Sequence, residues 1–240
     1  MRISDIQELR ARSDAPFFRR VAKRGWEKSG HFTFTSEFSA LRRWLADQLP
    51  QKQRVLTIGC GTGELERLLR RQGHQVVGID VVYEMLKAAR RHGFTRGIQA
   101  DAHFLPFPSA CFDVVILPET LGYIKVGRVF REVARVLRKR GRFLITTYPL
   151  HFRSHATYRK LSSTQVACAL GDAGFVVSHR RFLLVKPKHV REVDAERSCS
   201  LLYVMARKRS MCRGTACRVP TGLTNRQSER GQAEAFRSKR

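Results

Sequence analysis

The chain has 240 residues, of which 46 are Lys or Arg and 20 are Asp or Glu, so its formal net charge is +26. This length suits one α/β domain with a full hydrophobic core and is too short for two domains of ordinary size. Hydrophobic residues make up 42% of the chain, which excludes a wholly disordered protein, and no apolar run reaches the roughly 18 residues that a membrane-spanning helix requires.

Short apolar runs alternate with amphipathic stretches along most of the chain. A first helix is predicted from Thr35 or Ser36 to Pro50, because apolar residues recur on one of its faces. Five strands are predicted at residues 54–58, 76–79, 98–100, 114–117 and 143–147, with intervening helices that end near Gly73, Gly93 and Arg140. A capping box at Ser162 and Gln165 begins a further helix, and two last strands are predicted at residues 175–185 and 201–206. This alternation predicts an α/β fold with a mostly parallel sheet, helices on both faces and an antiparallel hairpin at the C-terminal edge.

The cysteines do not form a metal-binding or disulfide pattern. The six are Cys60, Cys111, Cys168, Cys199, Cys212 and Cys217, with no C-x-x-C motif and no Cys/His cluster at zinc spacing. No metal site is therefore predicted, and reduced thiols favour a cytoplasmic location.

The positive charge is concentrated in the second half of the chain, where residues beyond 125 carry a net charge of +19. Residues 208–240 lack apolar periodicity and are predicted to form a disordered basic tail, either a solvated terminus or an electrostatic tether to polyanions. We expect an aromatic-rich N-terminal lid segment at 1–50 and the main domain at 51–207. Acidic residues interrupt the N-terminal basic ones and no apolar segment accompanies them, so no targeting segment is expected.

The first predicted strand leads into a glycine-rich turn. Gly59, Gly61 and Gly63 follow Ile58 in the pattern G-x-G-x-G. Glycines let the backbone approach a ligand closely, and the free amides of the following helix favour a carboxylate or phosphate. A dinucleotide-binding loop would have glycine or alanine at the next position, where Glu64 would repel a pyrophosphate. The turn therefore predicts a ligand without phosphates at this place.

Two carboxylates follow at the ends of the next two strands. Asp80 lies about 20 residues after the turn, where a carboxylate can accept hydrogen bonds from both hydroxyls of a ribose. Asp101 ends the third strand and could accept from an adenine amine, while the N–H of Ala102 donates to a ring nitrogen. Since the carboxyl ends of these strands share one crevice, we expect a nucleoside site there.

The ordered set of motifs resembles the class I S-adenosylmethionine-dependent methyltransferases, in particular the small type-11-like family. The resemblance covers about residues 50–206 and rests on the segments Gly59–Gly63, Gly78–Asp80, Asp101–Phe107, Phe112–Val115, Glu132–Gly141 and Ala173–Phe175. It implies a doubly wound Rossmann-like fold with a seven-stranded sheet, and S-adenosylmethionine as the methyl donor.

The resemblance also implies a cofactor-binding set. The residues are Gly59, Cys60, Gly61 and Gly63 under the methionine part, Asp80 at the ribose with Val81 and Met85 nearby, Asp101 and Ala102 at the adenine, and Leu117 and Pro118 at the donor methyl. Two positions depart from the family pattern. Thr57 stands where an acidic residue is usual, which weakens the expected contact with the donor's amino group, and Val82 replaces a commonly polar residue.

No single catalytic residue is expected, because a sulfonium methyl group is already activated and positioning supplies much of the acceleration. A hydroxyl or amide acceptor would need a general base within hydrogen-bond reach. The candidates are Glu119, Tyr123 and His151, with His103, Tyr148 and His155 as further titratable residues near the predicted methyl site.

Four arginines are predicted on one helix face, and they do not decide between a small-molecule and a nucleic-acid partner. They are Arg128, Arg131, Arg135 and Arg138, at spacings of 3, 4 and 3. They form either a solvated surface or, with the 208–240 tail, a surface that follows phosphates. Three hypotheses remain: a methyltransferase for a small or lipophilic acceptor, a methyltransferase for RNA or a ribosome-associated substrate, and a non-catalytic protein with the same fold. The sequence makes no prediction of oligomeric state.

Overall fold

The computed structural model describes residues 16–24, 35–49, 52–151, 158–186 and 188–209. All of these lie within one compact unit, residues 1–210. Three aromatic residues of the predicted lid (Trp26, Phe32 and Phe34), the candidate His155 and the predicted tail from residue 210 onward lie outside the described residues.

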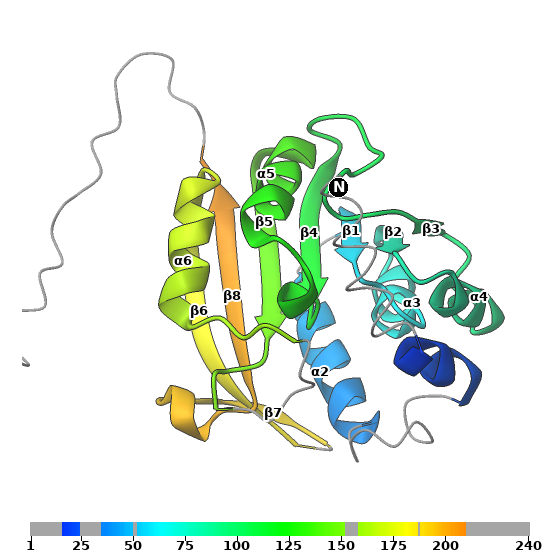
Figure 1. Ribbon diagram of the computed structural model, residues 1–240, viewed down its shortest axis with the longest axis horizontal. Coiled ribbons are helices and arrows are strands. Elements are labelled where there is room, and N and C mark those ends of the chain that lie inside the picture. Colours follow the sequence, from blue (N-terminus) through cyan, green and yellow to red (C-terminus); the bar gives the residue numbers. More distant parts are fainter. Residues whose placement is uncertain (1–15, 25–34, 50–51, 152–157, 187, 210–240) are drawn as a thin grey trace, which may run out of the picture. The chain divides into compact units, whose positions relative to one another are not determined.

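An eight-stranded sheet forms the centre of the fold (Figure 1). Its strands are β1 (Arg54–Ile58), β2 (Gln75–Asp80), β3 (Gly97–Gln99), β4 (Phe112–Pro118), β5 (Leu137–Thr147), β6 (Phe175–Val185), β7 (Val190–Val193) and β8 (Leu201–Lys208). Their order in the sheet is β3-β2-β1-β4-β5-β8-β6-β7. The pairs among β1 to β5 are parallel, and β8 is antiparallel to both β5 and β6.

Five α-helices, two short 3-10 turns and one N-terminal helix accompany the sheet in the described part of the chain. They are α2 (Thr35–Asp47), α3 (Glu64–Arg71), α4 (Tyr83–Arg91), α5 (Val126–Val136), α6 (Ser163–Asp172), η2 (Leu121–Tyr123), η3 (Glu196–Ser198) and the helix of residues 16–24. The predicted capping box of α6 is confirmed: Gln165 N donates to Ser162 Oγ at 3.2 Å, and Ser162 N donates to Gln165 Oε1 at 2.9 Å.

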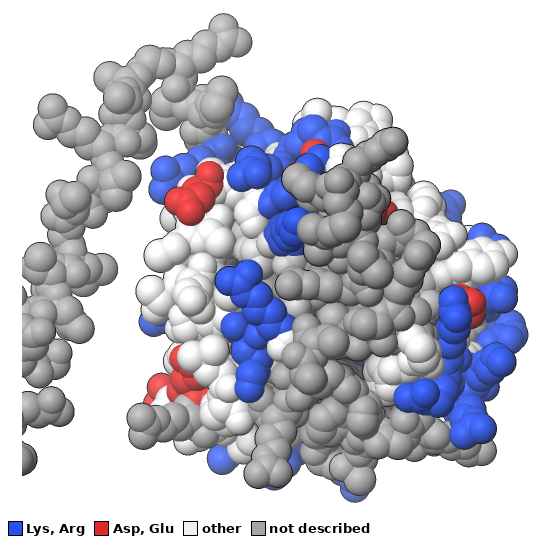
Figure 2. Space-filling view, viewed as in Figure 1, with Lys and Arg blue, Asp and Glu red and all other residues white. Residues whose placement is uncertain are grey.

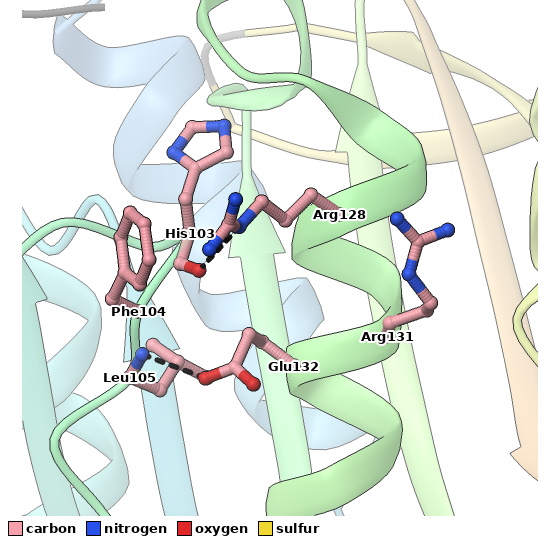
Figure 3. A pocket seen from close by; sticks show the side chains of 6 residues that line it. All are labelled: His103, Phe104, Leu105, Arg128, Arg131 and Glu132. Atoms are coloured by element: carbon pink, nitrogen blue, oxygen red, sulfur yellow. Dashed lines mark hydrogen bonds between the residues drawn. The ribbon is translucent and has the colours of Figure 1, made fainter. Parts of the chain in front are cut away.

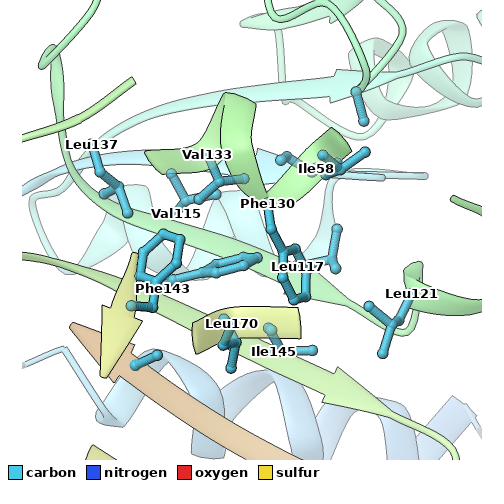
Figure 4. Close-up of a cluster of buried hydrophobic side chains, with 14 of the residues drawn as sticks. Ile58, Val115, Leu117, Leu121, Phe130, Val133, Leu137, Phe143, Ile145 and Leu170 are labelled. Carbon is cyan, nitrogen blue, oxygen red and sulfur yellow. The ribbon is translucent and has the colours of Figure 1, made fainter. Parts of the chain in front are cut away.

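The sheet is buried on both faces because apolar side chains occupy successive positions of its central strands. In β4, Val115 and Leu117 belong to the cluster formed with α5 and α6, whereas Val114 and Ile116 belong to the cluster formed with α2 and α3. Figure 4 shows the first cluster, in which the ring of Phe130 from α5 packs against that of Phe143 from β5, with centroids 5.1 Å apart. Because both faces of the sheet are covered by helices, the carboxyl ends of β1, β2 and β4 are held together at the same end of the sheet.

The predicted α/β class is confirmed, with three corrections to its elements. The helix after β4 ends at Val136 rather than at Arg140, because Leu137 is fully buried and pairs with Phe112 at the start of β5. The sheet has eight strands rather than seven, since the short polar strand β7 gave no alternating signal. The two last predicted strands, β6 and β8, do pair antiparallel. The edge itself is formed by β6 and β7, whereas the largely buried β8 lies inside the sheet.

Within the described residues, no helix is both long and apolar enough to cross a membrane.

Candidate functional site

The glycine turn connects β1 to α3 at the carboxyl edge of the sheet. Gly59, Gly61 and Gly63 have φ angles of 79°, 54° and 75°, a region that L side chains rarely adopt. A Cβ on Gly59 would lie 2.1 Å from Thr120 Oγ1, so only glycine fits there. The N–H groups of Gly59 and Cys60 both donate to the carbonyl of Ile79, at 2.8 and 3.0 Å. The turn is therefore held against the end of β2, with no side chain on its three glycines.

Asp80 connects this turn to the start of α4. Its Oδ2 accepts from Gly61 N and its Oδ1 from Val82 N, both at 2.9 Å. Burial raises the pKa of Asp80 to about 6, and the two backbone donors oppose that shift. Each carboxylate oxygen can accept a second hydrogen bond, so Asp80 can hold two ribose hydroxyls without losing its backbone contacts. The bare glycine backbone beside this carboxylate fits an adenosyl ligand.

Asp101 is oriented by a buried histidine. Its Oδ1 accepts from His103 N at 2.9 Å and lies 2.5 Å from His103 Nδ1. His103 Nε2 accepts from Lys125 N at 2.9 Å, so the ring proton sits on Nδ1 and is donated to Asp101. Burial alone would raise the pKa of Asp101, but the hydrogen bonds from His103 outweigh burial and lower it. Both nitrogens of His103 are engaged, which favours a positioning role for His103 over proton transfer.

The remaining predicted cofactor residues differ in how their side chains lie. Met85 is buried beneath Gly61, where its Cε would be 3.6 Å from an added Cβ. The thiol of Cys60 points away from the turn toward Gly78, and burial raises its pKa. Val81 is 46% exposed beside Asp80. The side chains of Ala102, Leu117 and Pro118 are buried, and that of Leu117 belongs to the core cluster (Figure 4).

Glu119 is held by an ion pair that sequence reasoning missed. Its Oε2 accepts from Arg42 Nη2 of α2 at 2.6 Å, and its Oε1 accepts from Thr146 Oγ1 at 2.5 Å. Although burial opposes it, Glu119 raises the pKa of Arg42. The only sequence signal for Arg42 was its place next to Leu41 on the apolar face of the predicted helix. Both carboxylate oxygens of Glu119 are engaged, so the geometry favours a structural role for this residue.

Three tyrosine rings meet where β4 and β5 end. The ring centroid of Tyr158 lies 5.0 Å from that of Tyr123 and 5.3 Å from that of Tyr148. The hydroxyl of Tyr158 lies 2.8 Å from Thr147 Oγ1, and burial raises its pKa to about 12. Tyr158 was missed because it follows a polar stretch with no recognisable period. The candidate His151 is exposed and its Nε2 lies 3.1 Å from the carbonyl of Cys199.

The helix of residues 16–24 packs beside this aromatic group. Val21 and Ala22 are buried against Met85 and Ala88 of α4. On the other side, the ring of Phe18 lies 5.7 Å from that of Tyr123. This helix therefore connects the α4 side of the crevice with the tyrosine cluster.

The four predicted arginines do not form one helix face. Arg138 belongs to β5 and pairs with Asp113 at 2.9 Å, whereas the other three lie on α5. Arg135 donates to Glu132 and to the carbonyls of Leu105 and Phe107. On the face seen in Figure 2, basic side chains form several separate groups.

A surface pocket lies between α5 and the loop after β3 (Figure 3). Its lining residues are His103, Phe104, Leu105, Arg128, Arg131 and Glu132. Arg128 lies 3.9 Å from the centre of the Phe104 ring and donates to the carbonyl of His103 at 3.1 Å. Three of the four arginines therefore contact other parts of the protein and fasten the loop after β3.

Comparison with known proteins agrees with this geometry. The family described as "Methyltransferase domain" matches residues 56–145. Residues 56–145 thus match a methyltransferase domain of the class I, S-adenosylmethionine-dependent type. The ubiquinone biosynthesis O-methyltransferase of Aeromonas salmonicida is 32% identical to it over 141 residues, which cover 54% of this chain and 59% of that protein. The chain thus matches little more than half the length of this curated relative.

Solved structures share the fold of the methyltransferase domain. A methyltransferase of Thermotoga maritima superposes with a TM-score of 0.64 at 20% identity, covering 81% of this chain and 99% of the other. A geranyl diphosphate C-methyltransferase of Streptomyces coelicolor, solved with S-adenosyl-L-homocysteine, superposes with a TM-score of 0.58 at 19% identity. The superposition covers 72% of this chain and 79% of the other. The predicted Rossmann-like fold is confirmed, and S-adenosylmethionine is the cofactor of this family.

Proposed function

We propose that the protein transfers a methyl group from S-adenosylmethionine to a small acceptor with an apolar or aromatic body. The observation that supports it most directly is the hydrogen bond from Gly61 N to Asp80 Oδ2, which joins a side-chain-free turn to a ribose-accepting carboxylate.

Each part of the site has a role in this proposal. Gly59, Gly61 and Gly63 would pass under the methionine part, Asp80 would accept from the ribose, and Asp101, oriented by His103, would accept from the adenine amine. S-adenosylmethionine supplies a methyl group on a sulfonium, which is already activated. The chain's task is then to orient the acceptor in line with that methyl and to exclude water.

The tyrosine cluster and the helix of residues 16–24 support a small acceptor. Tyr123, Tyr148 and Phe18 are half-buried beside the buried ring of Tyr158 and offer aromatic surface where β4 and β5 end. Aromatic rings pack well against apolar ligands. We assign the lid function to the helix of residues 16–24. Several similar proteins are named ubiquinone biosynthesis O-methyltransferases, after the synthesis of a small molecule, which favours the same acceptor class here. A phenolic hydroxyl of Tyr123 or Tyr148 is a better candidate for contacting the acceptor than Glu119, whose carboxylate is already paired.

An RNA acceptor and a non-catalytic role are the alternatives. Arg128, Arg135 and Arg138 make contacts within the protein, which weakens the case for a continuous phosphate-binding surface. The role of residues 208–240, the cytoplasmic location and the boundaries 1–50, 51–207 and 208–240 stay predictions.

The decisive experiment follows tritium from labelled S-adenosylmethionine into fractionated cell extract. We expect label in the organic phase, lost in an Asp80→Ala variant. Label in RNA would replace the small-molecule proposal by the RNA alternative. Absence of donor binding to the unmodified protein in calorimetry would refute the enzymatic function.

A further inference from the structure

A buried carboxylate in the helix that follows the glycine turn has none of the roles above. Glu66 is the third residue of α3, and only 1% of it is exposed. Neither of its carboxylate oxygens has a hydrogen-bond partner of normal geometry among the described residues. The hydroxyl of Thr57, a fully buried residue of β1, also lacks one. Buried polar groups are normally paired. Thr57 lowers the pKa of Glu66 by hydrogen bonding, but one hydroxyl can donate to only one carboxylate oxygen, so the other oxygen of Glu66 still lacks a partner among the described residues.

The surroundings of Glu66 show which charge is missing. Thr57 and Arg42 stabilise its ionised form, whereas Asp80 repels it, and Glu66 in turn acts on the thiol of Cys60. The one cation among these, Arg42, already donates to Glu119 at 2.6 Å. Burial is the main cause that raises the pKa of Glu66 to about 7. The cluster of Asp80, Glu66 and Glu119 is therefore richer in negative than in positive charge.

We propose that Glu66 is the counter-charge for the donor's α-ammonium group, acting through Thr57 near the end of β1. The hydroxyl of Thr57 can donate to the Glu66 carboxylate and accept from the ammonium, which pairs all three groups. Thr57 stands where an acidic residue is usual in this family, so a carboxylate from α3 takes over that charge. A cation entering this desolvated place is attracted more strongly than at the surface. This inference rests on the proposed donor binding.

Two ligands separate this role from a structural one. S-adenosylhomocysteine carries the α-ammonium group, whereas methylthioadenosine has the same adenosine and thioether without the amino-acid part. In calorimetry at pH 8, Glu66→Gln should weaken the binding of S-adenosylhomocysteine by about tenfold, because the amide can still accept from Thr57 but the negative charge opposite the ammonium is lost. Binding of methylthioadenosine should change by less than about twofold, because neither state of Glu66 acts on the shared part of the ligand.

A neighbouring carboxylate provides the matched control. Glu64 also belongs to α3, and its Oε1 accepts from Ser39 Oγ at 2.7 Å. Glu64→Gln removes one negative charge from the same helix and should leave both affinities unchanged. Adding Thr57→Asp to Glu66→Gln should restore binding of S-adenosylhomocysteine, because it returns a carboxylate to the same place.

Proton release gives a second readout. Because the Glu66 carboxyl is partly protonated near pH 7 without ligand, binding of the ammonium should release a proton from it. Heats measured in two buffers of different ionisation enthalpy should therefore show more protons released with S-adenosylhomocysteine than with methylthioadenosine. Release from Asp80, which faces the ribose of both ligands, cancels in this comparison, and the difference should vanish in Glu66→Gln.

Equal effects of Glu66→Gln on both ligands, or no effect on either, would overturn the inference while leaving donor binding intact. Failure of the unmodified protein to bind either ligand would instead overturn the proposed function, and this inference with it.

Discussion

Removing one partner of the ion pair between Arg42 and Glu119 should cost far more stability than breaking the other ion pairs near the site. The two side chains are 16% and 9% exposed, and Nη2 lies 2.6 Å from Oε2. Removing one partner of a buried pair costs about 3–5 kcal/mol, because the other charge stays buried without compensation. Thr146 holds the second oxygen of Glu119 in place, so the carboxylate cannot turn toward water when Arg42 is replaced. We therefore expect Arg42→Met to lower the free energy of unfolding by about 3 kcal/mol.

Urea unfolding followed by circular dichroism measures this change. The pair Arg19–Glu84, with 60% and 32% exposure and a separation of 3.4 Å, is the matched control, and Arg19→Met should cost less than about 1 kcal/mol. The double variant Arg42→Met/Glu119→Gln should lose less than the two single variants combined, because neither charge is then left alone. A loss below about 1 kcal/mol for Arg42→Met would refute the argument that the pair is effectively buried.

Four further predictions follow from the site. Gly59→Ala should destabilise the fold by about 2 kcal/mol or more, because the φ angle of 79° and the contact with Thr120 both exclude a Cβ. It should also abolish donor binding in calorimetry. Normal donor binding would contradict the claim that only glycine fits at this position. Glu66 should make the ligand-free protein less stable as pH rises from 4.5 to about 7, because its pKa in the folded state exceeds its ordinary value and the folded state binds more protons in that window. Glu66→Gln should remove this fall and stabilise the protein by up to about 3 kcal/mol at pH 8 in urea unfolding; a variant less stable than the unmodified protein at pH 8 would argue against a buried, ionisable Glu66. His103→Ala should lower the free energy of unfolding by about 1–3 kcal/mol and weaken donor binding, because the Lys125 N–H loses its acceptor and Asp101 keeps only the backbone N–H of residue 103. Unchanged donor affinity would show that Asp101 needs no orientation by the ring. In thermal unfolding, Arg135→Ala should lower the free energy of unfolding by about 1–3 kcal/mol, whereas Arg131→Ala should lower it by less than about 0.5 kcal/mol. A salt-dependent loss of RNA binding in Arg131→Ala would support the hypothesis of a phosphate-binding surface.

The grouping of the proposed adenosyl-binding residues could be predicted because each of them lies in a local pattern. Gly59, Asp80 and Asp101 each follow an apolar run, and the rule that parallel strands end at one edge brings them together. The fold class followed from the same alternation of strands and helices. These inferences need only the sequence order and the direction of the strands.

The rest of the site depends on contacts between distant residues. Arg42 and Glu119 are 77 positions apart, and nothing local distinguishes Arg42 from a solvated helix residue. The arginine spacing suggested one helix face, but the carbonyls of Leu105, Phe107 and Ala110 lack strand partners and accept from Arg135 and Arg138 instead. The helix boundary at Val136 was missed because residues 137–140 are mostly polar and follow the helix without a glycine or proline.

The position of β8 has a consequence for how the protein is made. This strand is the last of the described sheet along the chain, yet it lies between β5 and β6 and pairs with both. During synthesis, the edges of β5 and β6 that face β8 stay unpaired until residues 201–208 have left the ribosome. Such unpaired edges can form hydrogen bonds with strands of other chains. Chains interrupted before residue 201 should aggregate, whereas loss of residues beyond 209 leaves every strand of this sheet with its neighbours.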